Sequence, residues 1–217
     1  MAEQEKKEMI MEQGKEKVQQ ADQKDVLVFN RPYVFEGTEY KEVDLSGIRN
    51  LTIMDAIQAQ KDLINQRELA AAILTETTTA FARIIAAKAT GLPIEFFKLM
   101  PRGRNNKLVK TVQSYFNVEQ KTENHVLKFE NPYTFEGELY TEVNLCAIAD
   151  LNSMNESAAE NRMAVMGFAI TETKTNYYYS CVLASMATNK PEAFFTGLPL
   201  CETLKLKNAV NDPDFFE

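Results

Sequence analysis

Two stretches of the chain, near residues 30 and 130, have the pattern of β-hairpins. Residues 26–35 are rich in β-branched and aromatic side chains, which is typical of a strand. Pro32 has no amide hydrogen to donate, so we expect an edge strand or a break in the strand there. Glu36 and Gly37 supply a turn, and residues 40–45 return as the second strand. Because an isolated hairpin is marginally stable in water, its apolar face must pack on helices.

Helical spacing follows each hairpin. Thr52–Asp55 and Ser153–Glu156 both fit a capping box, in which a hydroxyl and a carboxylate satisfy the first free amides of a helix. The first of these helices is expected to reach about Gln66. Apolar residues then recur every three to four positions, which predicts a longer helix over residues 68–89.

A stop signal and a start signal mark the end of that longer helix. In Gly91-Leu92-Pro93 the glycine closes one helix and the proline opens the next. Asn189 stands at the glycine position in the second half of the chain, and asparagine is the next best residue for a left-handed conformation. A short helix carrying Phe96 and Phe97 is expected next, and a last helix over residues 106–116.

The two halves of the chain repeat one unit. Residues 26–54 align with residues 126–154 without a gap, and fifteen of these twenty-nine positions are identical. The match continues with gaps, in an alignment that sets Tyr177-Tyr178-Tyr179 against Phe81-Ala82-Arg83. Self-similarity over whole units indicates a duplicated domain, here a mostly helical α+β fold in which each copy is a β-hairpin followed by three to four helices. The expected division is a polar mobile arm (1–25), a first unit (26–116), a linker (117–125) and a second, diverged unit (126–217).

Charge separates the two copies. The whole chain carries a net charge of −7, which argues against a general nucleic-acid binder. Residues 26–116 hold twelve basic and nine acidic residues, whereas residues 126–216 hold six and twelve. We therefore hypothesise that the copies attract each other, either within one chain or head to tail between chains.

The composition indicates a cytoplasmic protein. No apolar stretch reaches eighteen residues, so no transmembrane helix is expected. The first twenty-four residues are polar and lack the apolar core of a signal peptide. The cysteines, Cys146, Cys181 and Cys201, all lie in the second half, and an odd, uneven set argues for a reducing compartment. Each is expected to be a small buried apolar side chain.

The candidates for catalytic chemistry are few. His125 is the only histidine, which argues against an imidazole metal site and against a histidine-activated nucleophile. Four hairpin carboxylates recur in both copies and could act as acid–base pairs, but we expect them simply to face water. They are Glu36, Glu42, Glu136 and Glu142. The sequence predicts a protein that is not an enzyme, with no catalytic residue, no metal and no cofactor.

Two groups of residues are candidates for partner binding. The aromatic pairs Phe96-Phe97 and Phe194-Phe195 are expected in the core, but adjacent residues on a helix point in different directions. One ring of each pair is therefore a candidate anchor for a partner. Arg102 and Arg104 begin a basic cluster that is either a solvated helix face or a contact for an acidic partner. The cluster continues with Lys107 and Lys110.

The hairpin also carries a motif that is found in a known family. Residues 32–45 read Pro-Tyr-x-Phe-Glu-Gly-x-x-Tyr-x-Glu-Val-x-Leu, and two helices, Gly91-Leu92-Pro93 and a basic final helix follow. This combination resembles the tail assembly chaperones of long-tailed bacteriophages, the group that includes the Mu-like and P2-like tail assembly proteins. In that family one unit is usually the whole protein. Here the resemblance covers each copy once, and the second copy departs from it at Asn189-Lys190-Pro191.

The resemblance implies binding without catalysis. Such chaperones hold the long, aggregation-prone helical tape-measure protein until tail-tube subunits polymerise around it. It therefore implies a protein of the bacterial host cytoplasm whose partners are the tape-measure protein and tail-tube subunits. Self-association is expected from the opposite charges of the two copies, and the net charge and the lack of an apolar span argue against nucleic-acid and membrane partners. Tandem units would raise the effective concentration of the second contact once the first has formed. The alternative is a structural tail or baseplate component that stays in the finished particle.

Overall fold

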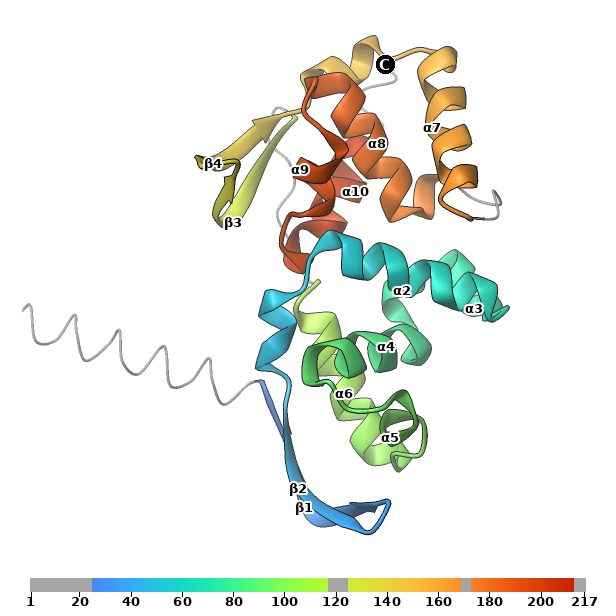
Figure 1. Cartoon of the computed structure of the whole chain (residues 1–217), viewed down its shortest axis with the longest axis vertical. Helices are drawn as coiled ribbons and strands as arrows, with labels where there is room; N and C mark the ends of the chain where they lie inside the picture. Colours follow the sequence, from blue (N-terminus) through green and yellow to red (C-terminus); the bar gives the residue numbers. More distant parts are fainter. Residues whose placement is uncertain (1–24, 117–124, 169–172, 213–217) are drawn as a thin grey trace, which may run out of the picture.

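The computed structural model describes residues 25–116, 125–168 and 173–212. The predicted arm and linker lie outside the described residues, except for Asp25 and His125. The described residues form two bodies of like architecture, stacked along the long axis of the molecule (Figure 1). Each body is a β-hairpin followed by helices, so the predicted fold class is confirmed.

The lower body in Figure 1 is the first unit, residues 25–116. Its hairpin leads through a short 3-10 helix into α2, which lies at the boundary with the second unit. Its elements are β1 (Val26–Phe35), β2 (Thr38–Asp44), η1 (Ser46–Asn50), α2 (Ile53–Asn65), α3 (Leu69–Ile73), η2 (Thr75–Thr77), α4 (Thr79–Thr90), α5 (Ile94–Lys98) and α6 (Arg102–Ser114).

The upper body is the second unit, described over residues 125–168 and 173–212. It repeats the order of elements, and its last helix is shorter because a 3-10 turn precedes it. Its elements are β3 (Val126–Phe135), β4 (Glu138–Asn144), η3 (Cys146–Asp150), α7 (Ser153–Val165), η4 (Thr173–Thr175), α8 (Tyr177–Thr188), α9 (Glu192–Thr196), η5 (Leu200–Glu202) and α10 (Thr203–Val210).

Each hairpin is a separate two-stranded antiparallel sheet. In the first unit Tyr33 pairs with Tyr40, and the register shifts between Val28 and Tyr33. Pro32 lies in that interval, so the strand itself runs on from Val26 to Phe35 but its pairing with β2 is irregular around the proline. Positive φ angles at both turn residues, 48° and 79°, give the type I′ geometry that suits the twist of a hairpin.

The prediction of one long helix over residues 68–89 is wrong. The structure divides this stretch into α3, η2 and α4. Leu74, with φ −136° and ψ 70°, breaks the helical path. The Thr78 hydroxyl then accepts a hydrogen bond from the Phe81 amide at 3.2 Å and caps α4. A threonine that caps a new helix therefore overrides the apolar periodicity.

The other helix ends follow the sequence signals more closely. The capping box at Thr52 and Asp55 is confirmed, and α2 ends one residue before Gln66. In the second unit the box is one residue earlier than expected, since Asn152 is the cap and Asn155 its partner. The last helix of the first unit begins at Arg102 rather than at residue 106. No described helix is both long and apolar enough to cross a membrane.

The structure also corrects the alignment of the two copies. The helices α4 and α8 have equal lengths and begin after equivalent caps, Thr78 and Asn176. The counterpart of Tyr177-Tyr178-Tyr179 is therefore Thr79-Ala80-Phe81, two residues earlier than the gapped sequence match suggests. This equivalence matters below, because it shows which surfaces differ between the units.

Candidate functional site

The predicted anchor Phe96 lies at the centre of the first unit rather than on its surface. Its ring centroid lies 4.9 Å from that of Tyr33, 5.3 Å from that of Phe35 and 4.8 Å from that of Tyr40, so the hairpin packs around it. The Tyr33 hydroxyl also donates a hydrogen bond to the Phe96 carbonyl at 3.0 Å. Phe97 is buried as well. These contacts explain how the marginal hairpin is held.

The second unit repeats this aromatic centre. The Phe194 ring lies 5.3 Å from Tyr133, 5.3 Å from Phe135 and 4.9 Å from Tyr140 between centroids. Phe195 is buried behind it. The expectation that both phenylalanine pairs lie in the core is therefore confirmed. The alternative, in which one ring of each pair faces solvent, is wrong, because the hairpin covers one ring and the helices cover the other. As folded, none of the four rings can anchor a partner.

The two predicted arginines have different environments. The Arg104 guanidinium lies over the Phe29 ring, 4.9 Å from its centroid, and donates to the carbonyls of Arg31 and Pro32. It therefore holds the irregular part of β1 against α6. Arg102 is exposed, as are Lys107 and Lys110. Of the predicted basic cluster, these side chains remain accessible.

The hairpin carboxylates face water as expected. Glu36, Glu42, Glu136 and Glu142 are all exposed. The cysteines are free, but only Cys181 is fully buried, and burial raises the pKa of its thiol. The expectation that all three are buried is wrong, because Cys146 is exposed.

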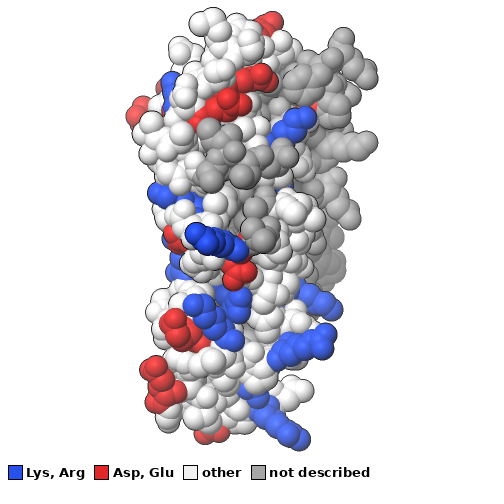
Figure 2. Space-filling model, turned by 90° about the vertical axis from the view of Figure 1, so that its right-hand side faces the viewer, with Lys and Arg blue, Asp and Glu red and all other residues white. Residues whose placement is uncertain are grey.

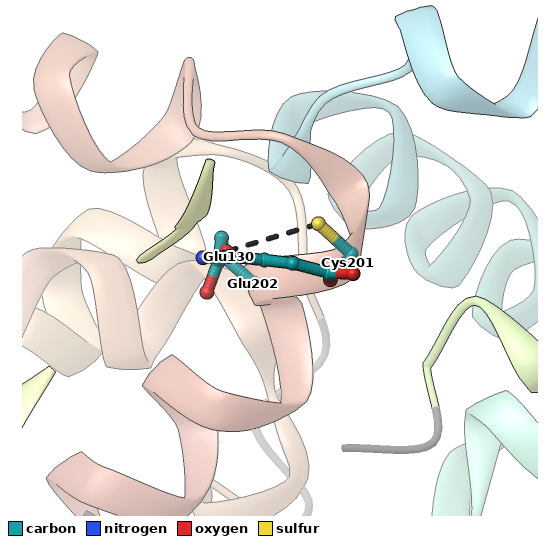
Figure 3. A group of neighbouring side chains, drawn as sticks. All are labelled: Glu130, Cys201 and Glu202. Carbon is teal, nitrogen blue, oxygen red and sulfur yellow. Dashed lines mark hydrogen bonds between the residues drawn. The ribbon is translucent and has the colours of Figure 1, made fainter. Parts of the chain in front are cut away.

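One group of potential metal ligands occurs among the described residues: Glu130, Cys201 and Glu202 (Figure 3). Glu202 is buried, accepts a hydrogen bond from the Glu130 amide at 2.7 Å and lies 3.2 Å from the Lys205 ammonium. Burial and the neighbouring carboxylates raise the pKa of the Cys201 thiol to about 12. The ammonium already balances the buried carboxylate and repels a cation, so the arrangement fits a structural ion pair better than a metal site.

The most extensive polar arrangement is the contact between the units, on α2. The Ile53 amide donates to the Leu198 carbonyl at 2.9 Å, and the Leu200 amide donates to the Leu51 carbonyl at 2.9 Å. These bonds form an antiparallel bridge between Thr52 and Pro199. The units are thus joined through their backbones as well as their side chains.

A buried amide continues this contact. The Gln60 Nε2 donates to the Thr175 carbonyl at 2.9 Å, and its Oε1 accepts from the Tyr177 amide at 3.1 Å. The same Nε2 donates to the Thr75 hydroxyl at 2.9 Å. Gln60 therefore connects two segments of the second unit with its own unit. A buried amide that loses such partners is costly, which makes the docking specific.

An ion pair completes the interface. Glu76 accepts hydrogen bonds from the Tyr177 hydroxyl and the Lys207 ammonium, both at 2.8 Å. Burial alone would raise the pKa of Glu76, but the hydrogen bonds and the Lys207 charge outweigh it and lower that pKa. Burial and the Glu76 charge raise the pKa of Tyr177 well above its usual range. The interface thus holds a charged carboxylate and a neutral phenol.

The two copies use different surfaces in this contact. On α2, four residues spaced along one helical face are buried: Ile53, Ala56, Ile57 and Gln60. We call them the docking face. At the equivalent positions of α7 stand Ser153, Glu156, Ser157 and Glu160, none of which is buried. The residues that face each unit's own core stay buried in both helices, namely Ala59 and Leu63 in α2 and Ala159 and Met163 in α7.

The receiving surface differs in the same way. Tyr177 and Leu200 of the second unit are buried against α2 and its neighbours. Their counterparts in the first unit, Thr79 and Arg102, are exposed. The fold and these surfaces define a duplicated α+β protein whose two units dock by unlike faces. No family model, curated protein or solved structure matches the chain.

Proposed function

We propose that the protein is a tail assembly chaperone of a phage or prophage that reversibly binds the tape-measure protein and has no catalytic role. Three residues that carry the resemblance, Tyr33, Phe35 and Tyr40, form the aromatic centre of the first unit around Phe96, and the second unit repeats this centre. The motif therefore corresponds to a structural unit that occurs twice. A duplicated binding unit suits a client that is long and repetitive.

Exposed apolar side chains on one side of the molecule support this proposal. The helices α3 and α7, from different units, lie on the same side (right in Figure 1). At their ends Ile73 is 68% exposed, Leu74 55% and Val165 89%. Figure 2 views this side and shows uncharged surface between the charged side chains, with Lys and Arg more numerous over the first unit. We call Ile73, Leu74 and Val165 the apolar side residues.

An apolar stripe on a client helix would find partners for its side chains here. Exposed apolar groups on two docked units give two weak contacts side by side, and weak paired contacts permit both binding and release. Burying one large apolar side chain contributes about 1.5–3 kcal/mol. The apolar side residues together can therefore hold a helix without fixing it permanently.

Co-expression with the tape-measure protein, the long helical client that the proposal names, tests the proposal. We expect a complex that co-purifies and more soluble tape-measure protein than without the chaperone. The triple variant Ile73→Glu, Leu74→Glu and Val165→Glu should abolish this gain. The matched control is Val28→Glu with Val34→Glu, since both valines are exposed on the hairpin instead.

The rival function, a structural tail or baseplate component, predicts a different distribution of the protein. Purified particles, analysed by mass spectrometry, should lack the protein if it is a chaperone. They should contain it at fixed stoichiometry if it is a structural component. If no complex forms and the tape-measure protein stays insoluble, the chaperone function is wrong. If the hairpin control fails as completely as the triple variant, the assignment of the binding side is wrong.

A further inference from the structure

The contact between the units is heterologous, because the two units contribute different surfaces to it. Each of these surfaces has an equivalent in the other unit that is not used within the chain. Within the chain, the docking face on α2 meets the receiving surface around Tyr177 and Leu200. The second unit has an open helix face at the docking positions, and the first unit has an open surface at the receiving positions. Repeated heterologous contacts between identical chains generate rings or filaments.

The open helix face of the second unit is acidic. Glu156 replaces Ala56, Glu160 replaces Gln60, and Asp150 in the preceding turn replaces Asn50. Two carboxylates four residues apart on a helix repel each other at a local cost. The structure gives none of these three carboxylates an ion pair or hydrogen bond with the described residues. Burial is the main cause that raises the pKa of the neighbouring Tyr179, and the charges of Glu156 and Glu160 raise it further, to about 12.

The open receiving surface of the first unit is basic. Arg102 replaces Leu200 and is the first residue of α6, whose first turn has no acidic residue. A cation at the start of a helix opposes the helix dipole, so the position is unfavourable for the helix alone. The guanidinium of Arg102 has no ion pair or hydrogen bond with the part of the chain that is described.

The contact within the chain shows how these surfaces would meet. There η1 packs against η5, which brings residues 46–50 beside Leu200. The equivalent contact between two chains sets Asp150 of one beside Arg102 of the other. Gln60 binds the start of α8, so Glu160 would lie at the start of α4, where the helix dipole favours a carboxylate. In the contact between chains, groups of opposite charge would therefore face each other at positions where the interface within the chain has apolar or amide groups.

We propose that the protein self-associates head to tail, with the second unit of one chain docking on the first unit of the next in the geometry of the internal interface. The contact is weaker than the internal one, because serines replace Ile53 and Ile57 and the Glu76–Lys207 pair has no equivalent. Lys174 and Val109 stand at those positions. Since charge replaces apolar burial, the association falls with ionic strength. It does not depend on the proposed chaperone function.

Two charge-reversal variants of the full chain test the direction of the contact. Arg102→Glu blocks the first-unit end, and the pair Glu156→Lys with Glu160→Lys blocks the second-unit end. Sedimentation velocity at low ionic strength should show oligomers of the wild type that dissociate on adding salt, and each variant alone should be a monomer. Mixed in equal amounts, the variants should form dimers and nothing larger, because only one contact is then free of substitutions. In the contact that carries both sets, Asp150 would lie beside the carboxylate introduced at position 102, and a lysine at position 160 would lie at the start of α4, where the helix dipole disfavours a cation.

The mixing experiment also controls for folding, since a misfolded variant could not form the dimer. A wild type that stays monomeric at low ionic strength overturns the proposal, and shows that the charged ends simply terminate a closed pair of units. Oligomers that survive in either variant alone overturn it as well. All these variants retain the apolar side residues, so their binding to the tape-measure protein is measured separately from their self-association.

Discussion

The helices α2 and α7 occupy the same place in their units, yet one is buried on two faces and the other on one. Both bury the residues that face their own core. Only α2 buries the docking face, which includes Ile53 and Ile57. At the equivalent positions α7 has Ser153 and Ser157. Burial against a partner therefore explains the substitutions better than any change of fold. At these helix positions, apolar residues are found only in the copy whose face a neighbour covers.

The hairpins teach the complementary lesson. They are the most similar part of the two copies in sequence, and each wraps one phenylalanine, Phe96 or Phe194. Neither hairpin takes a major part in the contact between the units, which runs through η1, α2, α8 and η5. Similarity between the copies thus marks the shared core, and divergence marks the interface and the open ends.

One way to test this comparison is to give one unit the residue that the other has at the equivalent position. The largest effect on stability is expected at Ile57. Ile57→Ser gives the docking face the residue of the second unit, removes a buried side chain and leaves a hydroxyl in its place. We expect a loss of about 3 kcal/mol in the free energy of unfolding. The reciprocal change, Ser157→Ile, is exposed and should alter stability by less than about 0.5 kcal/mol. Urea unfolding of both variants measures the difference.

Equal effects of the two exchanges would contradict the assignment of the docking face. The number of unfolding transitions of the Ile57→Ser variant is a second test, because this variant should weaken the contact between the units. If the interface holds them together, the single unfolding transition of the wild type should separate into two, because each unit then unfolds at its own stability.

The sequence was sufficient for features that depend on local rules. The Glu36-Gly37 turn, the irregular pairing near Pro32, the Thr52 cap and the left-handed Asn189 each follow from the conformational preferences of one or two residues. The docking face was not predicted, although the aligned copies differ there by Ser153 for Ile53 and Ser157 for Ile57. The sequence could not show which surface it covers, because residues 53–60 and 175–200 meet only through the tertiary arrangement.

The failed predictions have the same physical origin. Periodicity suggested one helix over residues 68–89 because it does not register a capping threonine such as Thr78. The rings of Phe96 and Phe194 were candidate anchors because helix geometry alone does not show that a hairpin folds over them. Asn152 and Ser153 are both residues that favour the N-cap position, and only the structure shows that Asn152 is the N-cap of α7.

A smaller effect is expected where the units differ by one methyl group. A Cβ at Gly47 would lie 2.1 Å from the Ala89 carbonyl oxygen, whereas the second unit has Ala147 at the equivalent position. Gly47→Ala should therefore cost about 2 kcal/mol through overpacking of η1 against α4. Ala147→Gly should cost about 1 kcal/mol or less, through backbone entropy. Thermal unfolding compares the two; a stable Gly47→Ala variant would mean that η1 and η3 pack alike.

The smallest of these effects, and the most specific, concerns pH. The folded-state pKa of Glu76 is lowered below its usual value of 4.5, so its ion pair stabilises the interface fully above that value. This stabilisation is lost as the pH falls through 4.5 and then through the lowered value, because the carboxylate becomes protonated. Glu76→Gln should cost about 1.5 kcal/mol at neutral pH and remove this part of the acid sensitivity.

The control for this prediction is Glu95→Gln. Glu95 forms an exposed pair with Lys98 at 3.7 Å on α5, away from the contact between the units, and such pairs contribute little. Urea unfolding from pH 7 to pH 3 should give nearly parallel curves for Glu95→Gln and the wild type. The curve for Glu76→Gln should start lower and converge on the wild type in acid. Curves that stay separated at low pH would mean that Glu76 acts through its shape in the interface and not through its charge.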